Sequence, residues 1–308
     1  MIWKKVRQKY TKNARIITNI NRELFNKLCT IFLPNNNNIL WINNPYDKPG
    51  NNLTNSSSAF FLNYKKVFIT RCNAEFVNYY INNGFEVLKF GKEALLNLER
   101  NHFVKKSLQE LIKKGLKVGN IIELNHSIEN LNKLNNFKNE CIHEGEPQLK
   151  YVFNDVLLPS NRLFIFLGNN NLWLGAITIS NKGKKRVTTD LMLRRKNAPK
   201  GVMEGLIFNI FNILKNEEYE YWSLGEVPFI IYDSPILTKE FMLNYAGRKL
   251  IFAYNYLGLY NFKNKFNPVW EETYLCGKPN LNLSSLLFIA YLTNLFKLVI
   301  TKIKIHIS

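Results

Sequence analysis

The stretch from Arg162 to Gly225 is the part of the sequence that most constrains the fold. Strands are expected at four runs rich in apolar residues: 162–168, 172–180, 186–194 and 219–225. The first three are separated only by the short polar turns NNN and NKGKK, which are typical of connections between antiparallel neighbours. A helix is expected at about 201–217, before the fourth strand. Three strands in a row followed by a helix and another strand predict a mixed sheet with helices on its faces.

The rest of the chain has the same α/β character. Further strands are expected at 39–42, 59–70, 85–90 and 116–124. Further helices are expected at 74–83, 104–114, 128–142 and 238–248, followed by a mixed region up to the run PVWEETYLC. Domain limits are expected at 1–100 for an N-terminal lobe, 101–280 for a second lobe and 281–308 for a C-terminal helix.

The charge of the chain suggests a polyanionic partner. Its 42 Lys and Arg residues outnumber its 23 Asp and Glu residues, which gives a formal net charge of +19. A surface this basic suits a nucleic acid or an anionic membrane. A second interpretation, a compositional bias that enriches Lys, Asn and Ile, stays open.

No metal site, cofactor motif or signal peptide is predicted. The four cysteines are far apart in the sequence, and the pair Cys141 and His143 has no second pair of ligands nearby. No run reaches the length of a membrane-spanning helix, and the longest, Leu286–Ile300, contains Thr293, Asn294 and Lys297. Ser285–Ile305 is therefore expected to be a helix that either docks on the core or lies on a membrane surface.

The stretch TTDLMLRRKNAPKGVMEGL places an acid and several cations at the start of a helix. Asp190 and Arg194 lie on the strand 186–194, and Gly201 begins the helix. The free N–H groups of a first helical turn, together with Arg194, Arg195 and Lys200, predict a site for phosphate or carboxylate. Asp190 would hold a substrate ammonium or fix an arginine. A solvated basic turn with a structural Asp190 is the alternative.

A strand, loop and helix in this order are also how acetyltransferase-like (GNAT) folds bind a pyrophosphate. Those enzymes carry R/Q-x-x-G-x-G/A in the loop, whereas this chain has RRKNAPKG, in which Pro199 replaces an N–H donor. The pattern keeps the fold and argues against acetyl-CoA as the donor.

Three motifs in this order resemble the catalytic domain of the phosphatidylglycerol lysyltransferases, the aminoacyl-phosphatidylglycerol synthases of the multiple peptide resistance factor family. The first is DLMLRRKNAPKGVMEGL from Asp190, the second is SLGEVP from Ser223, and the third is YNYLGLYNFKNKFNPVWEETYL from Tyr254. The resemblance covers roughly residues 75–278. One position departs from the family pattern: Leu193 stands where the family has an arginine, and Arg194 follows it.

The resemblance implies an α/β (α+β) fold of two tandem GNAT-like lobes, each with a mixed sheet flanked by helices. It implies transfer of an amino acid from aminoacyl-tRNA to a hydroxyl of phosphatidylglycerol or a related membrane lipid, with no metal and no cofactor. The partners would be aminoacyl-tRNA and an anionic phospholipid, and the chain would be cytoplasmic and peripheral on the inner face of the membrane. The family's N-terminal transmembrane helices are not expected here.

Asp190, Arg194, Lys263 and Lys265 are the predicted catalytic residues. Lys263 and Lys265 are expected to share one face of an extended segment, with Phe262 and Phe266 on the other. We expect the four predicted catalytic residues to meet in one pocket, because ligands in open α/β sheets gather at the carboxyl ends of strands.

Further substrate-binding residues are predicted at strand ends and in the basic turn. They are Arg195, Lys200, Gly201, Ser223, Glu226 and Glu271. Glu204, in the first helical turn, is expected to have a structural role.

Two other functions stay open at this stage. One is another GNAT-superfamily acyltransferase that acts on a peptide or small-molecule acceptor. The other is a basic module without activity that binds RNA or membrane.

Overall fold

The computed structural model describes residues 31–32, 38–43, 61–152, 157, 159–182, 185–230 and 238–307. The chain divides into two compact units, which are described separately below. Unit 1 comprises Met1–Leu88 and Tyr274–Leu287, and unit 2 comprises Lys89–Thr273 and Phe288–Ser308. The limits 1–100, 101–280 and 281–308 expected from the sequence remain predictions about the two lobes.

Unit 1 contains a short sheet around an apolar core. β1 (Ile31–Phe32) pairs antiparallel with β2 (Ile39–Asn43), and β2 pairs parallel with β3 (Lys66–Asn73). Side chains from alternate positions of β2 and β3 form one face of the core, which the helix α4 (Val77–Asn82) also enters through Tyr80. The strand predicted at 59–70 begins later in the structure, because β3 starts at Lys66 and Phe61 and Leu62 are helical. Residues 59 and 60 lie outside the described residues.

Unit 2 is built on a larger mixed sheet. Its strands follow the spatial order β4-β9-β8-β7-β6-β5. Their bounds are β4 (Glu86–Asn97), β5 (Gly119–Leu124), β6 (Arg162–Gly168), β7 (Trp173–Lys182), β8 (Arg186–Arg194) and β9 (Tyr221–Pro228). All neighbouring pairs are antiparallel except β8 and β9, which are parallel. β10 (Val269–Lys278) begins in unit 2 and ends in unit 1.

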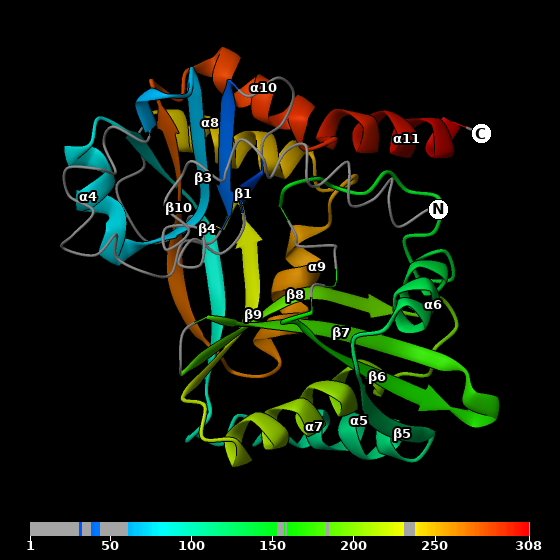
Figure 1. Cartoon of the computed structure of the whole chain (residues 1–308). Coiled ribbons are helices and arrows are strands. Elements are labelled where there is room, and N and C mark those ends of the chain that lie inside the picture. The colour runs from blue at the N-terminus through cyan, green and yellow to red at the C-terminus, as the bar shows by residue number, and fades with distance from the viewer. Residues whose placement is uncertain are drawn as a thin grey trace. The chain divides into compact units, whose positions relative to one another are not determined.

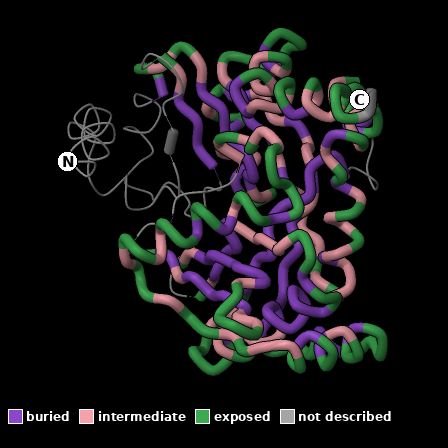
Figure 2. Tube along the Cα trace, turned by 90° about the vertical axis from the view of Figure 1, so that its right-hand side faces the viewer, coloured by how far each residue is buried: buried purple, intermediate pink, exposed green. Residues whose placement is uncertain are grey.

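Helices cover both faces of this sheet (Figure 1). Phe164 and Phe166 of β6 pack in the core under α5 (Lys106–Leu116) and α7 (Val202–Asn216), while Leu163 and Ile165 face α6 (Ile128–Lys138). This alternation follows from the two-residue period of a strand. Buried residues accordingly concentrate in the strands, and the outer surfaces of the helices are exposed (Figure 2). The predicted fold class, α/β with mixed sheets flanked by helices, is confirmed.

The region between α8 (Thr238–Lys249) and β10 is helical, not extended. α9 spans Tyr256–Asn264, and the side chain of its N-cap, Asn255, accepts a hydrogen bond of 2.8 Å from the Gly258 N–H. Lys265 is the C-cap. The predicted extended face shared by Lys263 and Lys265 is therefore wrong, because residues two apart on a helix point to nearly opposite sides.

The predicted C-terminal helix is two helices, α10 (Leu283–Leu292) and α11 (Leu295–Ile307). The break coincides with Asn294, whose φ of 63° is in the left-handed region that asparagine tolerates. Among the described residues, no single helix has the length and apolar character of a membrane span. α10 and α11 meet these two criteria only together, and they are bent by 69°.

Candidate functional site

The strands β8 and β9 separate part-way along their length. Their parallel pairing joins Arg186, Val187 and Thr188 to Tyr221, Trp222 and Ser223 and includes no later pair, although both strands are described throughout and continue to Arg194 and Pro228. Backbone groups on the facing edges beyond this point do not pair with each other. We call this place the divergence point, and most of the predicted site residues lie around it.

Asp190 lies at a β-bulge next to the divergence point. Thr178 and Ile179 of β7 are opposite Leu191 and Thr189 of β8, so Asp190 is the extra residue. Its buried carboxylate accepts hydrogen bonds from Asn161 Nδ2 at 2.7 Å and from Ser180 Oγ at 3.1 Å. The bulge turns Asp190 to the α6 side of the sheet, where Ser180 lies, whereas Thr189 accepts a hydrogen bond from the buried Trp222. The carboxylate is thus held in one orientation by two donors.

Lys263 brings a buried cation to the divergence point. From α9, its Nζ donates to the carbonyl oxygens of Gly225 at 2.9 Å and Glu226 at 3.0 Å. Gly225 has a φ of 92°, and a Cβ there would lie 3.5 Å from Lys263 Nζ and 3.9 Å from the Thr189 carbonyl oxygen. The ammonium is therefore bound to β9, and both the ammonium and the Thr189 carbonyl of β8 lie near Gly225.

Ser223 is held by hydrogen bonds within the SLGEVP segment of β9. It has no exposed surface, donates to Glu93 Oε1, and accepts from the Gly225 N–H at 3.0 Å. Glu93 also accepts from Arg186 at 3.1 Å, and the same Arg186 nitrogen lies 3.4 Å from Glu271 Oε2. These contacts fix the backbone conformation that presents the Gly225 and Glu226 carbonyls to Lys263.

Glu226 has a second set of partners through its side chain. Its buried carboxylate accepts a hydrogen bond of 2.5 Å from Thr273 Oγ1. Burial and the negative charge of Glu226 raise the pKa of Tyr254, so this phenol stays protonated at neutral pH.

The first turn of α7 is filled from within the protein. Gly201, with a φ of 97°, packs against α5, and a Cβ there would lie 2.1 Å from the Leu111 carbonyl oxygen and 2.8 Å from the Gly115 nitrogen. Glu204 in this turn is buried and forms an ion pair of 2.8 Å with Lys265. The backbone of α5 therefore packs directly against Gly201, and the acidic residue of this turn, Glu204, is paired with Lys265.

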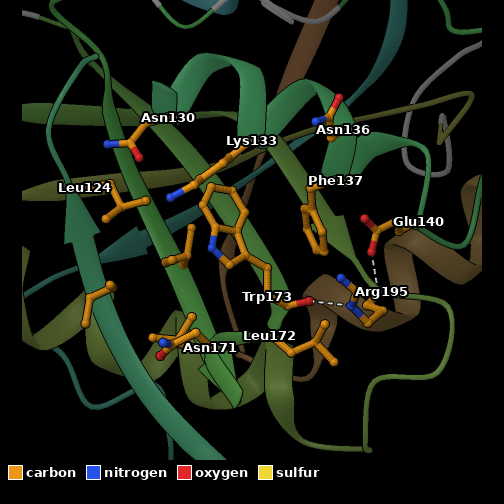
Figure 3. Close-up of a pocket in the computed structure, with 13 residues that line it drawn as sticks. Leu124, Asn130, Lys133, Asn136, Phe137, Glu140, Asn171, Leu172, Trp173 and Arg195 are labelled. Atoms are coloured by element: carbon orange, nitrogen blue, oxygen red, sulfur yellow. Dashed lines mark hydrogen bonds and ion pairs between the residues drawn. The ribbon is translucent and has the colours of Figure 1, made fainter. Parts of the chain in front are cut away.

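The arginines of the basic turn before α7 bind carbonyl and carboxylate groups of the protein itself. Arg194 Nη2 donates to the Ala198 carbonyl at 2.6 Å. Arg195 donates to the Trp173 carbonyl at 2.5 Å, pairs with Glu140 and lies over the Phe137 ring, as Figure 3 shows. Arg195, Phe137, Glu140 and Trp173 are among the residues that line an open groove of about 490 Å³ between α6 and strands β5, β6 and β7. Lys200 is exposed.

The structure thus brings Asp190, Lys263, Ser223 and Glu226 to the divergence point and gives Lys265 a different environment. Lys265 pairs with Glu204 of α7, which covers one face of the sheet, whereas the Asp190 carboxylate accepts from Ser180 on the other face, so the two side chains have different partners. The pocket expected for the four residues stays a prediction. Four residues that hold the predicted ones were not expected from the sequence: Asn161, Ser180, Glu93 and Arg186. No local pattern identifies them.

The profile of the family "Phosphatidylglycerol lysyltransferase, C-terminal" matches residues 58–277, which include all the residues of the candidate site. The chain belongs to this family. By its name, this family is one of transferases. The phosphatidylglycerol lysyltransferase of Staphylococcus xylosus is 22% identical over 280 residues, covering 78% of this chain and 31% of the relative. The one of Bacillus subtilis (strain 168) is 28% identical over 105 residues, covering 33% of this chain and 12% of the relative. The chain thus spans less than a third of the length of these relatives.

Solved structures agree on the fold. L-PGS from Bacillus licheniformis superposes with a TM-score of 0.67 at 20% identity, covering 86% of this chain and 84% of that one. FemX superposes with a TM-score of 0.52 at 10% identity, covering 84% and 85%. At these identities the likeness concerns the fold alone.

Proposed function

We propose that this chain transfers an aminoacyl group from aminoacyl-tRNA to a hydroxyl of phosphatidylglycerol or a related membrane lipid. One observation carries the proposal: the family match at 58–277 coincides with a divergence point that holds a fixed carboxylate and a fixed ammonium. The motif residues are thus present together with an arrangement that can orient a charged acyl donor.

The reaction is an ester exchange. A bond forms between the lipid hydroxyl oxygen and the acyl carbonyl carbon, and the bond between that carbon and the ribose oxygen of the tRNA breaks. The hydroxyl proton goes to the ribose oxygen. Because the ester is already activated, the protein has to position the two substrates and stabilise the negative charge that develops on the carbonyl oxygen.

Asp190 and Lys263 have complementary roles in this proposal. The Asp190 carboxylate binds the ammonium of the aminoacyl group, since Asn161 and Ser180 hold it in a defined orientation. Lys263 supplies positive charge at a position fixed by two carbonyls of β9. Arg194, Lys265, Arg195, Lys200 and Glu271, which lie nearer the surface, are proposed to contact the tRNA end or the lipid phosphate. Glu226 is proposed to line the substrate site.

Lysines on α5 support a tRNA partner. Lys106, Lys113 and Lys117 are exposed and follow one side of this helix by their spacing. Such a row contributes to the net charge of +19 and suits a phosphate backbone. A chain that uses both tRNA and a lipid is proposed to work in the cytoplasm, at the inner face of the membrane.

The donor is tested with purified protein, lysyl-tRNA and phosphatidylglycerol dispersed in detergent. Transfer of labelled lysine to the lipid is expected, as measured by thin-layer chromatography and mass spectrometry of the extracted lipid. Digesting the tRNA with RNase beforehand should abolish the product, and acetyl-CoA should not replace the donor. Transfer that survives RNase, or an acetylated product, would instead indicate another acyltransferase.

The tRNA contact is tested by salt dependence. The triple variant K106Q/K113Q/K117Q should bind tRNA more weakly. The plot of the logarithm of the binding constant against the logarithm of salt concentration should become less steep by roughly 2–3, because each lost phosphate contact removes about one released counterion. An unchanged slope would place the tRNA elsewhere on the surface. The single variant Lys150→Gln, outside α5, is the control.

A further inference from the structure

α11 presents an apolar stripe to solvent. Phe296, Ile300 and Ile303 are 41%, 53% and 43% exposed. Spacings of four and three residues place them on the same side of the helix. A soluble helix normally turns such a stripe towards its own core, so this orientation requires an explanation.

The opposite side of α11 is attached to unit 2, which fixes the direction of the stripe. Leu298 is 4% exposed, and Lys302 forms an ion pair of 2.5 Å with Glu146. In the turn before the helix, the Lys150 N–H donates to the Thr293 carbonyl at 3.1 Å. The helix therefore cannot roll to bury its apolar stripe without breaking these contacts.

Positive charge accompanies the stripe. Lys297 and Lys304 are exposed and lie along one edge of it by their helical positions. The 36 residues that follow Glu272 contain four lysines and no Asp or Glu. An apolar stripe with lysines at its edge and no acidic residue is complementary to an anionic lipid surface.

Size also favours a bilayer over a protein partner. Stable protein interfaces bury about 800 Å² on each partner, usually with 20–30 residues a side, whereas the stripe has three apolar side chains among those whose burial the structure describes. A bilayer accepts a narrow stripe, because the side chains enter the boundary between head groups and acyl chains. The stripe also lies outside the family match, which ends at residue 277.

We infer that α11 is a docking surface for an anionic phospholipid bilayer. Phe296, Ile300 and Ile303 enter the boundary below the head groups, and Lys297 and Lys304 contact the lipid phosphates. The inference deepens the proposed function, on whose lipid acceptor the choice of a bilayer rests, by naming the surface that brings the protein to that lipid.

The test uses the full chain and sedimentation with vesicles of phosphatidylcholine alone or mixed with phosphatidylglycerol. The stripe variant F296Q/I300Q/I303Q should bind mixed vesicles about tenfold or more weakly than wild type. The variant K297Q/K304Q should lose about fivefold per lysine on mixed vesicles and nothing on phosphatidylcholine alone. The matched control F241Q/I128Q/I142Q replaces side chains of similar exposure, 60%, 54% and 45%, and should bind like wild type. Melting temperatures of all variants should match wild type within a few degrees.

Two results would overturn the inference. One is equal vesicle binding by the stripe variant and wild type. The other is a concentration-dependent dimer in light scattering that the stripe variant loses, which would assign the stripe to a second copy of the chain. The proposed function is tested separately, by lysine transfer to lipid dispersed in detergent. In this assay the stripe variant should transfer lysine at the wild-type rate. Vesicle binding without any transfer would refute the function and leave the docking surface standing.

Discussion

Charged side chains lie close to backbone groups at two places, the divergence point of β8 and β9 and the first turn of α7. The partners of these side chains differ between the two places. At the divergence point, Lys263 lies on two backbone carbonyls and Asp190 on two side-chain donors. At the α7 turn, α5 backbone fills the space beside Gly201, and Glu204 pairs with Lys265. The positive end of a helix dipole favours an anion, and at α7 the first turn contains one of its own, Glu204.

The largest effect should come from adding a side-chain carbon at Gly201, where α5 backbone packs against the α7 turn. Gly201→Ala should lower the free energy of unfolding by about 4 kcal/mol, because the new Cβ would meet α5 backbone at a positive φ. Gly145→Ala is the control. Its φ is 74°, with nothing within 4 Å of a Cβ, so only about 1 kcal/mol is expected. Denaturant unfolding measures both, and equal losses would mean that α5 does not approach the turn this closely.

Lys263 and Lys265 give the next largest difference. Lys263→Met should lower kcat/KM for lysyl transfer by about 100- to 1000-fold, if its charge acts on the developing oxyanion. It should also destabilise the fold, because two buried carbonyls lose a donor.

Lys265→Met is the matched control for that variant. It removes one ion pair of a side chain that is 42% exposed and should cost far less activity. Steady-state kinetics at matched folded fractions decides the comparison. Equal losses from both lysines would remove the distinction between the two regions and support the catalytic role predicted for Lys265.

Asp190→Asn should have an intermediate effect. The substitution keeps the size of the side chain and removes the charge that is proposed to bind the donor ammonium, so kcat/KM should fall by about 30-fold, or 2 kcal/mol. With N-acetylated aminoacyl-tRNA, which lacks this ammonium, wild type and variant should be equally slow. An undiminished loss with the acetylated donor would show that Asp190 acts by holding Asn161 and Ser180 instead.

The smallest effect should be that of Glu204→Gln. It breaks the ion pair with Lys265 and keeps the packing of the turn, so the free energy of unfolding should fall by about 1 kcal/mol, with transfer nearly unchanged. Glu144→Gln, at an exposed position, should change neither quantity. A large loss of transfer in Glu204→Gln would bring the α7 turn back as part of the site.

The residues that hold the site illustrate how far the sequence could lead. Asp190 and Lys263 were predicted from motifs whose order along the chain is itself the signal. Asn161 and Glu93 were not, because they lie 29 and 130 residues from Asp190 and Ser223, the residues they hold. A hydrogen bond between distant residues leaves no local pattern for a single sequence to show.

By itself the sequence determined most strands of unit 2 and its helices up to α8, and β6 (Arg162–Gly168) and β8 (Arg186–Arg194) begin and end where the apolar runs do. It did not predict α9 or the break between α10 and α11. Such elements follow from periodicity and turn residues within a few positions of each other. Only the tertiary structure decided that Lys263 and Lys265 turn to different partners, that α5 backbone fills the space at Gly201, and that the stripe of α11 faces outwards. The reason is physical: burial and backbone contact depend on which segments meet, and these segments come from distant parts of the chain.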